Sequence, residues 1–354
     1  MADWLIILCS IASCLAGLLA LVVVGSHYYY RYKFLDQVIR IFQEKPLFIR
    51  PRGDIVPDAE DVSFRTSDGL TLRGCYLRGV GKRRGVILFN PEFGSNRWSS
   101  DLYCAQLRET GYDVFAYEPR NQGESDVDPD YVPLQWITDK DLIDARAALA
   151  YLKSRADIDP RGLGIFGISK GGGLALLLAA EDRVVKCVIT DGAYATYLTV
   201  VPFMRRFVSI YSPHKRIQAI APDALYGAIG MAAIRRVAKA RRVRFQWVES
   251  RAKHIAVPVL MIHGEADSYI KPEMAKALFN RVGAPEKQFW AVPTAKHNQA
   301  LNVAPVEYAK RLVDFFDDHL GDIPESRVVM PKPATVADET TTPAAVRLRQ
   351  AAME

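Results

Sequence analysis

The sequence predicts an α/β protein with a mainly parallel sheet of about eight strands and helices on both faces. Short apolar segments alternate with helix-like segments from about residue 60 onward, which is the pattern of repeated strand–helix–strand units. One short segment is followed at once by Gly-x-Ser-x-Gly, which favours a sharp strand-to-helix turn. The 354 residues are 49% apolar and 24% charged, an ordinary globular composition, and we assign residues 56–321 to one folded domain.

An uncharged N-terminal stretch predicts one transmembrane helix before this domain. Residues 4–24 (WLIILCSIASCLAGLLALVVV) carry no charge, and ~20 such residues are what a helix needs to cross a bilayer. Trp4 and the tyrosines at positions 28 to 30 flank the stretch, where amphipathic rings favour the headgroup region. We therefore predict a single-pass membrane anchor over residues 1–26.

A cleaved signal peptide is the main alternative to the anchor. The first segment of such a peptide should be basic, but here it contains only Asp3, and no clear A-x-A site follows the apolar stretch. Arg31, Lys33, Arg40 and Lys45 all follow the stretch, so the positive-inside rule predicts that the folded domain faces the cytoplasm.

The segment over residues 27–55 is predicted to be an amphipathic linker. Its apolar residues recur in steps of four and three, as on one face of a helix, and basic residues lie nearby. Two interpretations stay open: the stripe lies on an anionic headgroup surface, or it packs on the domain. The stripe consists of Tyr28, Tyr32, Leu35, Ile39 and Phe42.

The predicted strands of the domain follow in order. Residues 61–66 and 70–77 form an antiparallel hairpin around a Ser-Asp-Gly turn. Six further apolar segments suit strands that are buried on both faces, and helix-like segments separate most of them. The six segments are residues 85–90, 113–118, 162–166, 185–190, 257–263 and 288–292.

Two segments depart from this alternation. The interval of about 197–255 is far longer than a crossover needs, and its apolar, helix-like sequence predicts a helical lid inserted over the sheet. Residues 322–354 mix Pro, Thr, Ala and charged residues without a sustained period, which predicts a disordered tail.

Ser169 in "GISKG" is the candidate nucleophile. It follows an apolar strand at the carboxyl edge of the sheet, where ligands bind in parallel α/β folds. Gly167 and Gly171 allow the chain to turn sharply, and the N-terminus of the next helix supplies free N–H groups.

A serine nucleophile needs a base, and the base needs an orienting acid. Of the 6 histidines, His297 is the one in a loop directly after the final strand, again at the carboxyl edge. Asp267 follows the preceding strand and is the candidate acid, with Glu265 and Asp191 as alternatives. The three residues then occur in the order Ser, Asp, His.

Here the sequence resembles the α/β-hydrolase family of serine hydrolases over roughly residues 60–320. The resemblance rests on "GISKG" for the nucleophile turn, "HGEADSYI" for the acid loop, "AKHN" for the base, and "EPRNQGES" for the turn after the fourth strand. The N-terminal span makes the chain most similar to membrane-anchored α/β-hydrolase-domain proteins. The resemblance implies substrates such as acylglycerols, lysophospholipids or protein acyl-thioesters.

The resemblance also implies an oxyanion hole formed by the backbone N–H groups of Phe93 and Lys170. In one place the sequence departs from the family. Where the family has His-Gly after the strand that precedes the first helix, this chain has Pro91 and Glu92. We expect the Glu92 side chain to point away from the oxyanion, because Gly94 and Asn96 keep the turn residues of the loop.

These observations predict a serine hydrolase that cleaves carboxylic esters or thioesters, with no cofactor or metal. An acyltransferase with the same triad and a membrane-tethered pseudo-hydrolase are the alternatives. Nucleic acid is not expected as a partner, although the net charge is +6.

The lid sequence favours a lipid or an acylated protein as the substrate. Its apolar residues could line an acyl groove, and its basic residues could face anionic lipid, or simply form a solvated helix face. The apolar residues are Val200, Val201, Phe203, Met204, Phe207, Val208 and Ile210, and the basic residues are Arg205, Arg206, Lys215, Arg216, Arg235, Arg236, Lys239, Arg241, Arg242 and Arg244.

Overall fold

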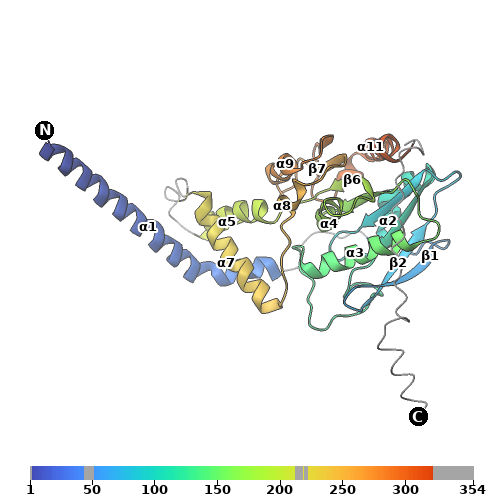
Figure 1. Cartoon of the computed structure of the whole chain (residues 1–354), viewed down its shortest axis with the longest axis horizontal. Helices are drawn as coiled ribbons and strands as arrows, with labels where there is room; N and C mark the ends of the chain where they lie inside the picture. Colours follow the sequence, from blue (N-terminus) through green and yellow to red (C-terminus); the bar gives the residue numbers. More distant parts are fainter. Residues whose placement is uncertain (1, 44–51, 212–217, 219–221, 322–354) are drawn as a thin grey trace, which may run out of the picture. The chain divides into compact units, whose positions relative to one another are not determined.

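The computed structural model describes residues 2–43, 52–211, 218 and 222–321 (Figure 1). Residues 44–51 of the predicted linker and the predicted tail over residues 322–354 lie outside the described residues. Within the described part of the chain, one long N-terminal helix precedes an α/β domain that carries an inserted pair of long helices.

The domain is built on an 8-stranded sheet in the order β1-β2-β4-β3-β5-β6-β7-β8, which confirms the predicted fold class. β1 and β2 form the predicted hairpin, β2 also pairs antiparallel with β4, and the other neighbours are parallel. The strands are β1 (Glu60–Arg65), β2 (Thr71–Leu77), β3 (Gly85–Asn90), β4 (Tyr112–Tyr117), β5 (Leu163–Ile168), β6 (Val185–Asp191), β7 (Val259–Gly264) and β8 (Lys287–Val292).

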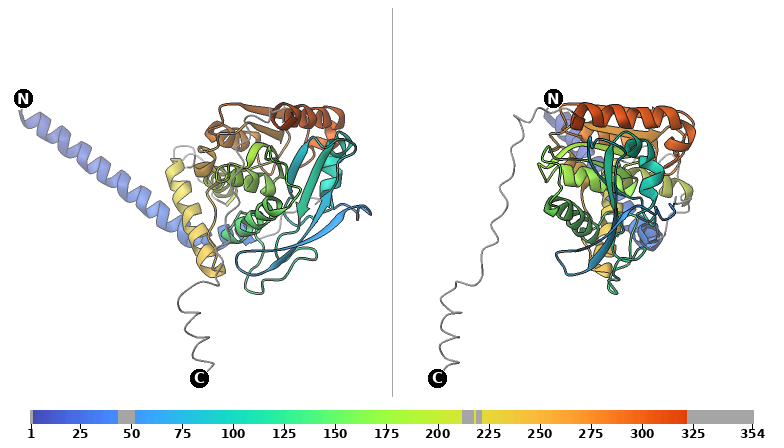
Figure 2. Two further views of the ribbon diagram at one scale, coloured as in Figure 1. Left: turned by 45° about the vertical axis from the view of Figure 1, so that its right-hand side comes forward. Right: turned by 90° about the vertical axis from the view of Figure 1, so that its right-hand side faces the viewer.

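Helices cover both faces of the sheet (Figure 2). In β3, Val86 and Leu88 belong to one core cluster and Ile87 and Phe89 to the other, because successive side chains of a strand point to opposite faces. The first cluster is covered by α3 (Asp139–Ser154), α4 (Lys170–Ala179), α8 (Val248–Ala252) and α9 (Pro272–Arg281), and the second by α2 (Ser99–Glu109) and α11 (Pro305–Phe316), with the short α10 (Ala300–Val303) and the π-helical turn η1 (Asp317–Gly321) beside α11.

A buried arginine holds the turn after β4. Arg120 is 1% exposed, and its guanidinium donates to Asp144 of α3 at 2.7 Å and to Asp68 of the β1–β2 turn at 2.8 Å. A buried charge is tolerated only when it is paired in this way. Arg120, the arginine of "EPRNQGES", therefore joins three segments that are distant in the sequence.

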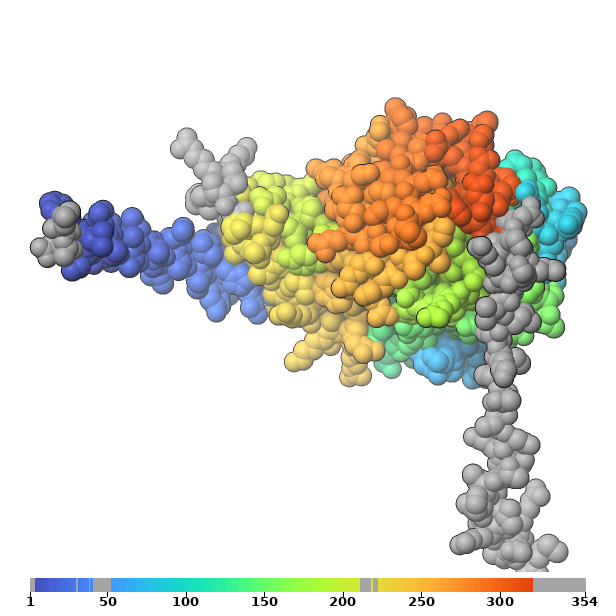
Figure 3. Space-filling model, turned by 45° about the horizontal axis from the view of Figure 1, so that its top comes forward, coloured from blue at the N-terminus to red at the C-terminus, as the bar shows by residue number. Residues whose placement is uncertain are grey.

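The N-terminal helix α1 (Ala2–Gln43) runs without a break from the predicted anchor into the predicted linker. Near its C-terminal end, Phe34 and Leu35 are 4% and 8% exposed. They belong to a third core cluster, formed mainly by α5 (Tyr197–Tyr211) and α7 (Asp223–Arg241), the two long helices of the segment predicted to be a lid. In Figure 3 the yellow residues of α7 adjoin the blue C-terminal half of α1.

These contacts bear on the two interpretations of the amphipathic stripe. Leu35 and Ile39 lie in or against the third cluster, so this part of the stripe packs on the lid. Tyr28 and Tyr32 are 64% and 94% exposed, and the side chain of Phe42 lies outside the described part of the chain. The face that packs is therefore centred on the neighbouring Phe34, whose ring lies edge-on to Phe207 of α5 at 5.8 Å.

Phe34→Ala is expected to loosen the lid helices, because truncating a buried phenylalanine costs ~3–5 kcal/mol of packing and transfer free energy. The measurement is the rate of trypsin cleavage within the lid in full-length protein in detergent. Tyr32→Ala, exposed on the same helix, is the matched control and should be cleaved at the wild-type rate. Equal rates for wild type and Phe34→Ala would show that α1 does not hold the lid.

Candidate active site

Ser169 lies on the sharp turn between β5 and α4, with φ 53° and ψ −114°. A non-glycine residue in this region costs ~1–3 kcal/mol and persists only where the surroundings enforce it. The Ser169 N–H donates to the Asp191 carbonyl oxygen of β6 at 2.7 Å. A Cβ atom on Gly167 would lie 2.2 Å from the Gly171 oxygen, and one on Gly171 would lie 2.1 Å from the Asn90 oxygen. Both positions of "GISKG" therefore require glycine.

The structure brings Ser169, His297 and Asp267 together at the carboxyl edge of the sheet. The Ser169 Oγ lies 2.9 Å from His297 Nε2, and His297 Nδ1 lies 2.6 Å from Asp267 Oδ2. Because a carboxylate only accepts, Nδ1 carries the ring hydrogen of the neutral imidazole, and Nε2 is free to accept from the serine hydroxyl. All three residues are buried, with 2%, 8% and 3% exposed.

Backbone groups fix the position of the Asp267 carboxylate, and a second buried histidine lies beside it, with His263 Nε2 3.6 Å from Asp267 Oδ2. Asp267 Oδ1 accepts from the N–H groups of Tyr269 and Ile270, both at 2.8 Å. His263 Nε2 donates to the Ile270 carbonyl oxygen at 2.8 Å, and burial lowers the pKa of this imidazole, so His263 stays neutral beside the acid.

The two alternative acids lie in other surroundings. Glu265 is exposed in the loop after β7. The Asp191 carboxyl accepts from the Tyr308 hydroxyl of α11 at 3.0 Å, on the other side of the sheet from α3. Of the three candidates, Asp267 is the one that hydrogen-bonds His297.

The two residues predicted to donate to an oxyanion lie side by side. Lys170 is the first residue of α4, so its N–H is among the four that have no partner within the helix. Its side chain is buried: Nζ donates to Asp141 Oδ1 at 2.7 Å and to the Leu134 carbonyl oxygen at 2.6 Å. The same ammonium lies 5.3 Å from the ring centroid of Phe93, which is a cation–π contact.

Glu92, the departure from the family sequence, is 2% exposed. Among the described residues neither of its carboxyl oxygens has a hydrogen-bond partner. Burial raises the pKa of Glu92 to about 8, and the nearby Asp191 charge adds to the effect. The Glu92 side chain is therefore an interior carboxyl group. That it points away from the oxyanion stays a prediction.

Sequence reasoning missed an aromatic wall over the candidate base. The Tyr269 ring lies 5.2 Å from the His297 ring, and Phe203 of α5 lies 6.1 Å from Tyr269 and 6.2 Å from Trp136. The Tyr269 hydroxyl also donates to the Gln135 side chain. Tyr269 is part of the acid-loop motif "HGEADSYI", so its position in the sequence could have indicated that it lies near His297.

Of the lid residues predicted to line an acyl groove, Phe203 is the one that lies beside the candidate active site, against Tyr269. Val200, Val201, Met204 and Val208 are buried in the third core cluster instead. Of the remaining two, Phe207 packs on Phe34, and Ile210 is 66% exposed.

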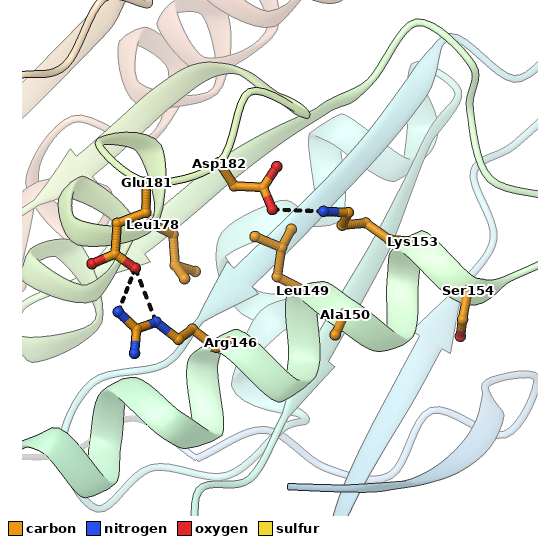
Figure 4. Close-up of a pocket in the computed structure, with 8 residues that line it drawn as sticks. All are labelled: Arg146, Leu149, Ala150, Lys153, Ser154, Leu178, Glu181 and Asp182. Atoms are coloured by element: carbon orange, nitrogen blue, oxygen red, sulfur yellow. Dashed lines mark hydrogen bonds and ion pairs between the residues drawn. The ribbon is translucent and has the colours of Figure 1, made fainter. Parts of the chain in front are cut away.

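Two surface grooves along α3 contain none of the predicted site residues. The first, of about 450 Å³, is crossed by ion pairs from Arg146 to Glu181 and from Lys153 to Asp182, each at 2.7 Å (Figure 4). The second, of about 900 Å³, shares Arg146 and Glu181 and reaches α7. The acids of these grooves are already paired with neighbouring bases, so we assign them no role in catalysis.

Gly171→Ala is expected to displace the β3–α2 loop, because the new methyl group would meet the backbone oxygens of Asn90 and Pro91 at 2.1 and 2.6 Å. Overpacking of this kind costs ~1–3 kcal/mol or more. Gly173→Ala is the matched control, since its methyl group meets the Ile137 side-chain terminus, which can move. Thermal unfolding measures both variants, and an equal midpoint for the two would contradict the tight contact at Gly171.

Comparison with known proteins places this geometry in a family context. Residues 81–302 match the Hydrolase_4 family, described as serine aminopeptidase, S33. The esterase Pf2001 of Pyrococcus furiosus superposes with a TM-score of 0.57 at 20% identity, over 78% of this chain and 100% of that chain. At this identity the similarity shows the fold.

The chain is also similar in sequence to curated proteins, among them the following two. The uncharacterized protein YfhR of Escherichia coli is 24% identical over 269 residues, which cover 73% of this chain and 80% of YfhR. The acyltransferase drtE of Aspergillus calidoustus is 31% identical over 134 residues, which cover 37% of this chain and 42% of drtE.

Proposed function

The chain belongs to the Hydrolase_4 family of serine aminopeptidase-type α/β-hydrolases, and from this premise we propose that it cleaves carboxylic esters or thioesters with Ser169 as nucleophile. The observation that carries the proposal is the continuous hydrogen-bonded series Asp267–His297–Ser169, at 2.6 and 2.9 Å, on a strained strand-to-helix turn. Such a series is what activates a serine hydroxyl, which is otherwise a weak nucleophile.

The proposed reaction has two halves. As Ser169 Oγ attacks the acyl carbonyl carbon, His297 Nε2 takes the hydroxyl proton, and Asp267 stabilises the resulting imidazolium. The N–H groups of Phe93 and Lys170 bind the oxyanion, and each such donor contributes ~10²–10³-fold in rate. His297 then gives its proton to the leaving alcohol or thiol. In the second half, water attacks the acyl-enzyme and passes a proton to His297. His297 then gives this proton to Ser169 Oγ as the carboxylic acid is released.

We propose that the substrate carries an acyl chain, which lies against the aromatic wall of Phe203, Tyr269 and Trp136. The ring of Tyr269 lies 5.2 Å from the ring of His297, and Phe203 links Tyr269 to Trp136. The proposed membrane anchor supports a lipid or acylated substrate, because the helix that begins at Trp4 is long enough to cross a bilayer and its most apolar 18-residue window is unburied.

The proposed contact with anionic lipid rests on α1 more than on α7. Arg236 of α7 lies 3.8 Å from Asp36 of α1. Because an α-helix rises ~1.5 Å per residue, Asp36 is about 18 Å beyond Val24, the end of the apolar stretch. Charges are largely screened beyond ~8–10 Å at physiological salt. Arg31 and Lys33 are nearer to the proposed headgroup region, on the side that we propose is cytoplasmic.

An acyltransferase is the second candidate function. The match to the acyltransferase drtE favours it, and so does the burial of Ser169, since transfer to an acceptor requires exclusion of water from the acyl-enzyme. Addition of a competing alcohol to the assay separates the two functions, because a transferase forms the new ester and a hydrolase forms the free acid.

Ser169→Ala is expected to abolish hydrolysis of p-nitrophenyl esters by full-length protein in detergent. Loss of the nucleophile of a triad costs ~10⁴–10⁶-fold in kcat. Ser100→Ala, another buried serine of the same domain, is the matched control and should keep wild-type turnover within a few-fold. Wild-type protein that is folded but hydrolyses no ester from acetate to palmitate would favour the pseudo-hydrolase.

A further inference from the structure

The carboxyl group of Glu92 lies in surroundings that do not accommodate a negative charge. It is 2% exposed, and neither oxygen has a hydrogen-bond partner among the described residues. An ionised carboxylate in such a place loses its hydration without compensation, whereas the protonated acid is neutral and loses much less. The geometry alone therefore favours the neutral form.

The groups around Glu92 come from several elements and supply no compensating cation. Asp191 of β6 is 1% exposed and accepts from Tyr308 of α11 at 3.0 Å, and Tyr103 of α2 has a buried hydroxyl with no partner among the described residues. Both Asp191 and Tyr103 interact electrostatically with Glu92. Two buried cations of this region are already paired: Lys170 of α4 with Asp141 and Arg97 of the loop with Glu118, both at 2.7 Å. Burial raises the pKa of Asp191 to about 7 as well, so the pair does not hold two charges near neutral pH.

Glu92 occupies a critical place in the loop between β3 and α2. The preceding residues Asn90 and Pro91 touch the nucleophile turn at Gly171. The following residue, Phe93, is a proposed oxyanion donor. The loop beyond it is fixed by the Ser95 N–H, which donates to the Glu92 carbonyl oxygen at 3.2 Å, and by the Gly94 N–H, which donates to Gln122 at 3.0 Å. The buried Glu92 side chain anchors the middle of this loop in the interior.

We propose that Glu92 is a positioning residue of the oxyanion loop, that it functions as a neutral carboxylic acid, and that its ionisation weakens oxyanion binding. The inference rests on the proposed hydrolase function. Ionisation acts in two ways: the charged side chain is driven out of the interior and displaces the loop, and while it stays inside, its charge opposes the developing oxyanion.

The pH dependence of kcat/KM tests the role of Glu92. Wild type should lose activity as the pH rises through about 8, the pKa of Glu92. Glu92→Gln is neutral at every pH and similar in shape, so it should keep activity near pH 7 and lack this alkaline decline. Glu92→Ala removes the anchor and should lose activity at all pH values, up to the ~10²-fold that one oxyanion donor contributes.

Asp191→Asn supplies an independent check on the same assay. The negative charge of Asp191 raises the pKa of Glu92, so its removal should move the alkaline decline to lower pH. A decline at the wild-type pH in Glu92→Gln would overturn the proposal. So would equal activity of Glu92→Ala and wild type at pH 7, or equal impairment of Glu92→Gln and Glu92→Ala.

Thermal unfolding at different pH values separates this inference from the proposed function, because it needs no substrate. The pKa of Glu92 rises on folding from 4.5 to about 8, so the stability due to its neutral form is fully present below about pH 4.5 and is lost up to about pH 8. The midpoint of wild type should therefore fall relative to Glu92→Gln across this range. If the difference in unfolding midpoint between wild type and Glu92→Gln stays constant over this pH range, the proposal that Glu92 is a neutral acid is overturned. Absence of ester hydrolysis by wild type at every pH contradicts the proposed function, and with it the catalytic effect of Glu92.

Discussion

The backbone of Ser169 is the constraint on which the site depends. Its φ of 53° is unfavourable for a side chain, and the turn is held by the hydrogen bond to Asp191 and by close contact of Gly171 with the Asn90 backbone. That contact brings the end of β3, the end of β5 and the N-terminus of α4 to one point. The serine hydroxyl, the helix N–H groups and the β3–α2 loop meet there because no Cβ atom separates them.

A second constraint is that a titratable side chain in the interior must either pair its charge with an opposite charge or be neutral. Arg120 is paired with Asp144 and Asp68, and Lys170 is paired with Asp141. Glu92 has no such partner among the described residues, and burial instead raises its pKa. The same physical rule thus accounts for the ion pairs of Arg120 and Lys170 and for the neutral acid that we propose at Glu92.

Much of the fold was predictable because parallel strands that are covered on both faces have short, continuous apolar sequences. The candidate triad was predictable because each of its residues stands in a loop that directly follows one of these strands. The contacts that sequence reasoning missed join distant segments: Phe34 with Phe207, Phe203 with Tyr269, and Lys170 with Asp141. Periodicity alone placed the apolar stripe of α1 on Tyr28 and Tyr32, but the lid selected the face of Phe34. Burial of Glu92 was not predictable, because a single glutamate in a loop is usually exposed.

The central claim is that Ser169 is the nucleophile, and the most direct measurement identifies the residue that becomes covalently modified. Full-length wild-type protein is treated with a fluorophosphonate, digested, and analysed by tandem mass spectrometry. The account predicts one phosphonylated residue, Ser169, and no adduct after unfolding in denaturant, since activation requires His297 within hydrogen-bond distance. An adduct on another serine, or none on the folded protein, would contradict it.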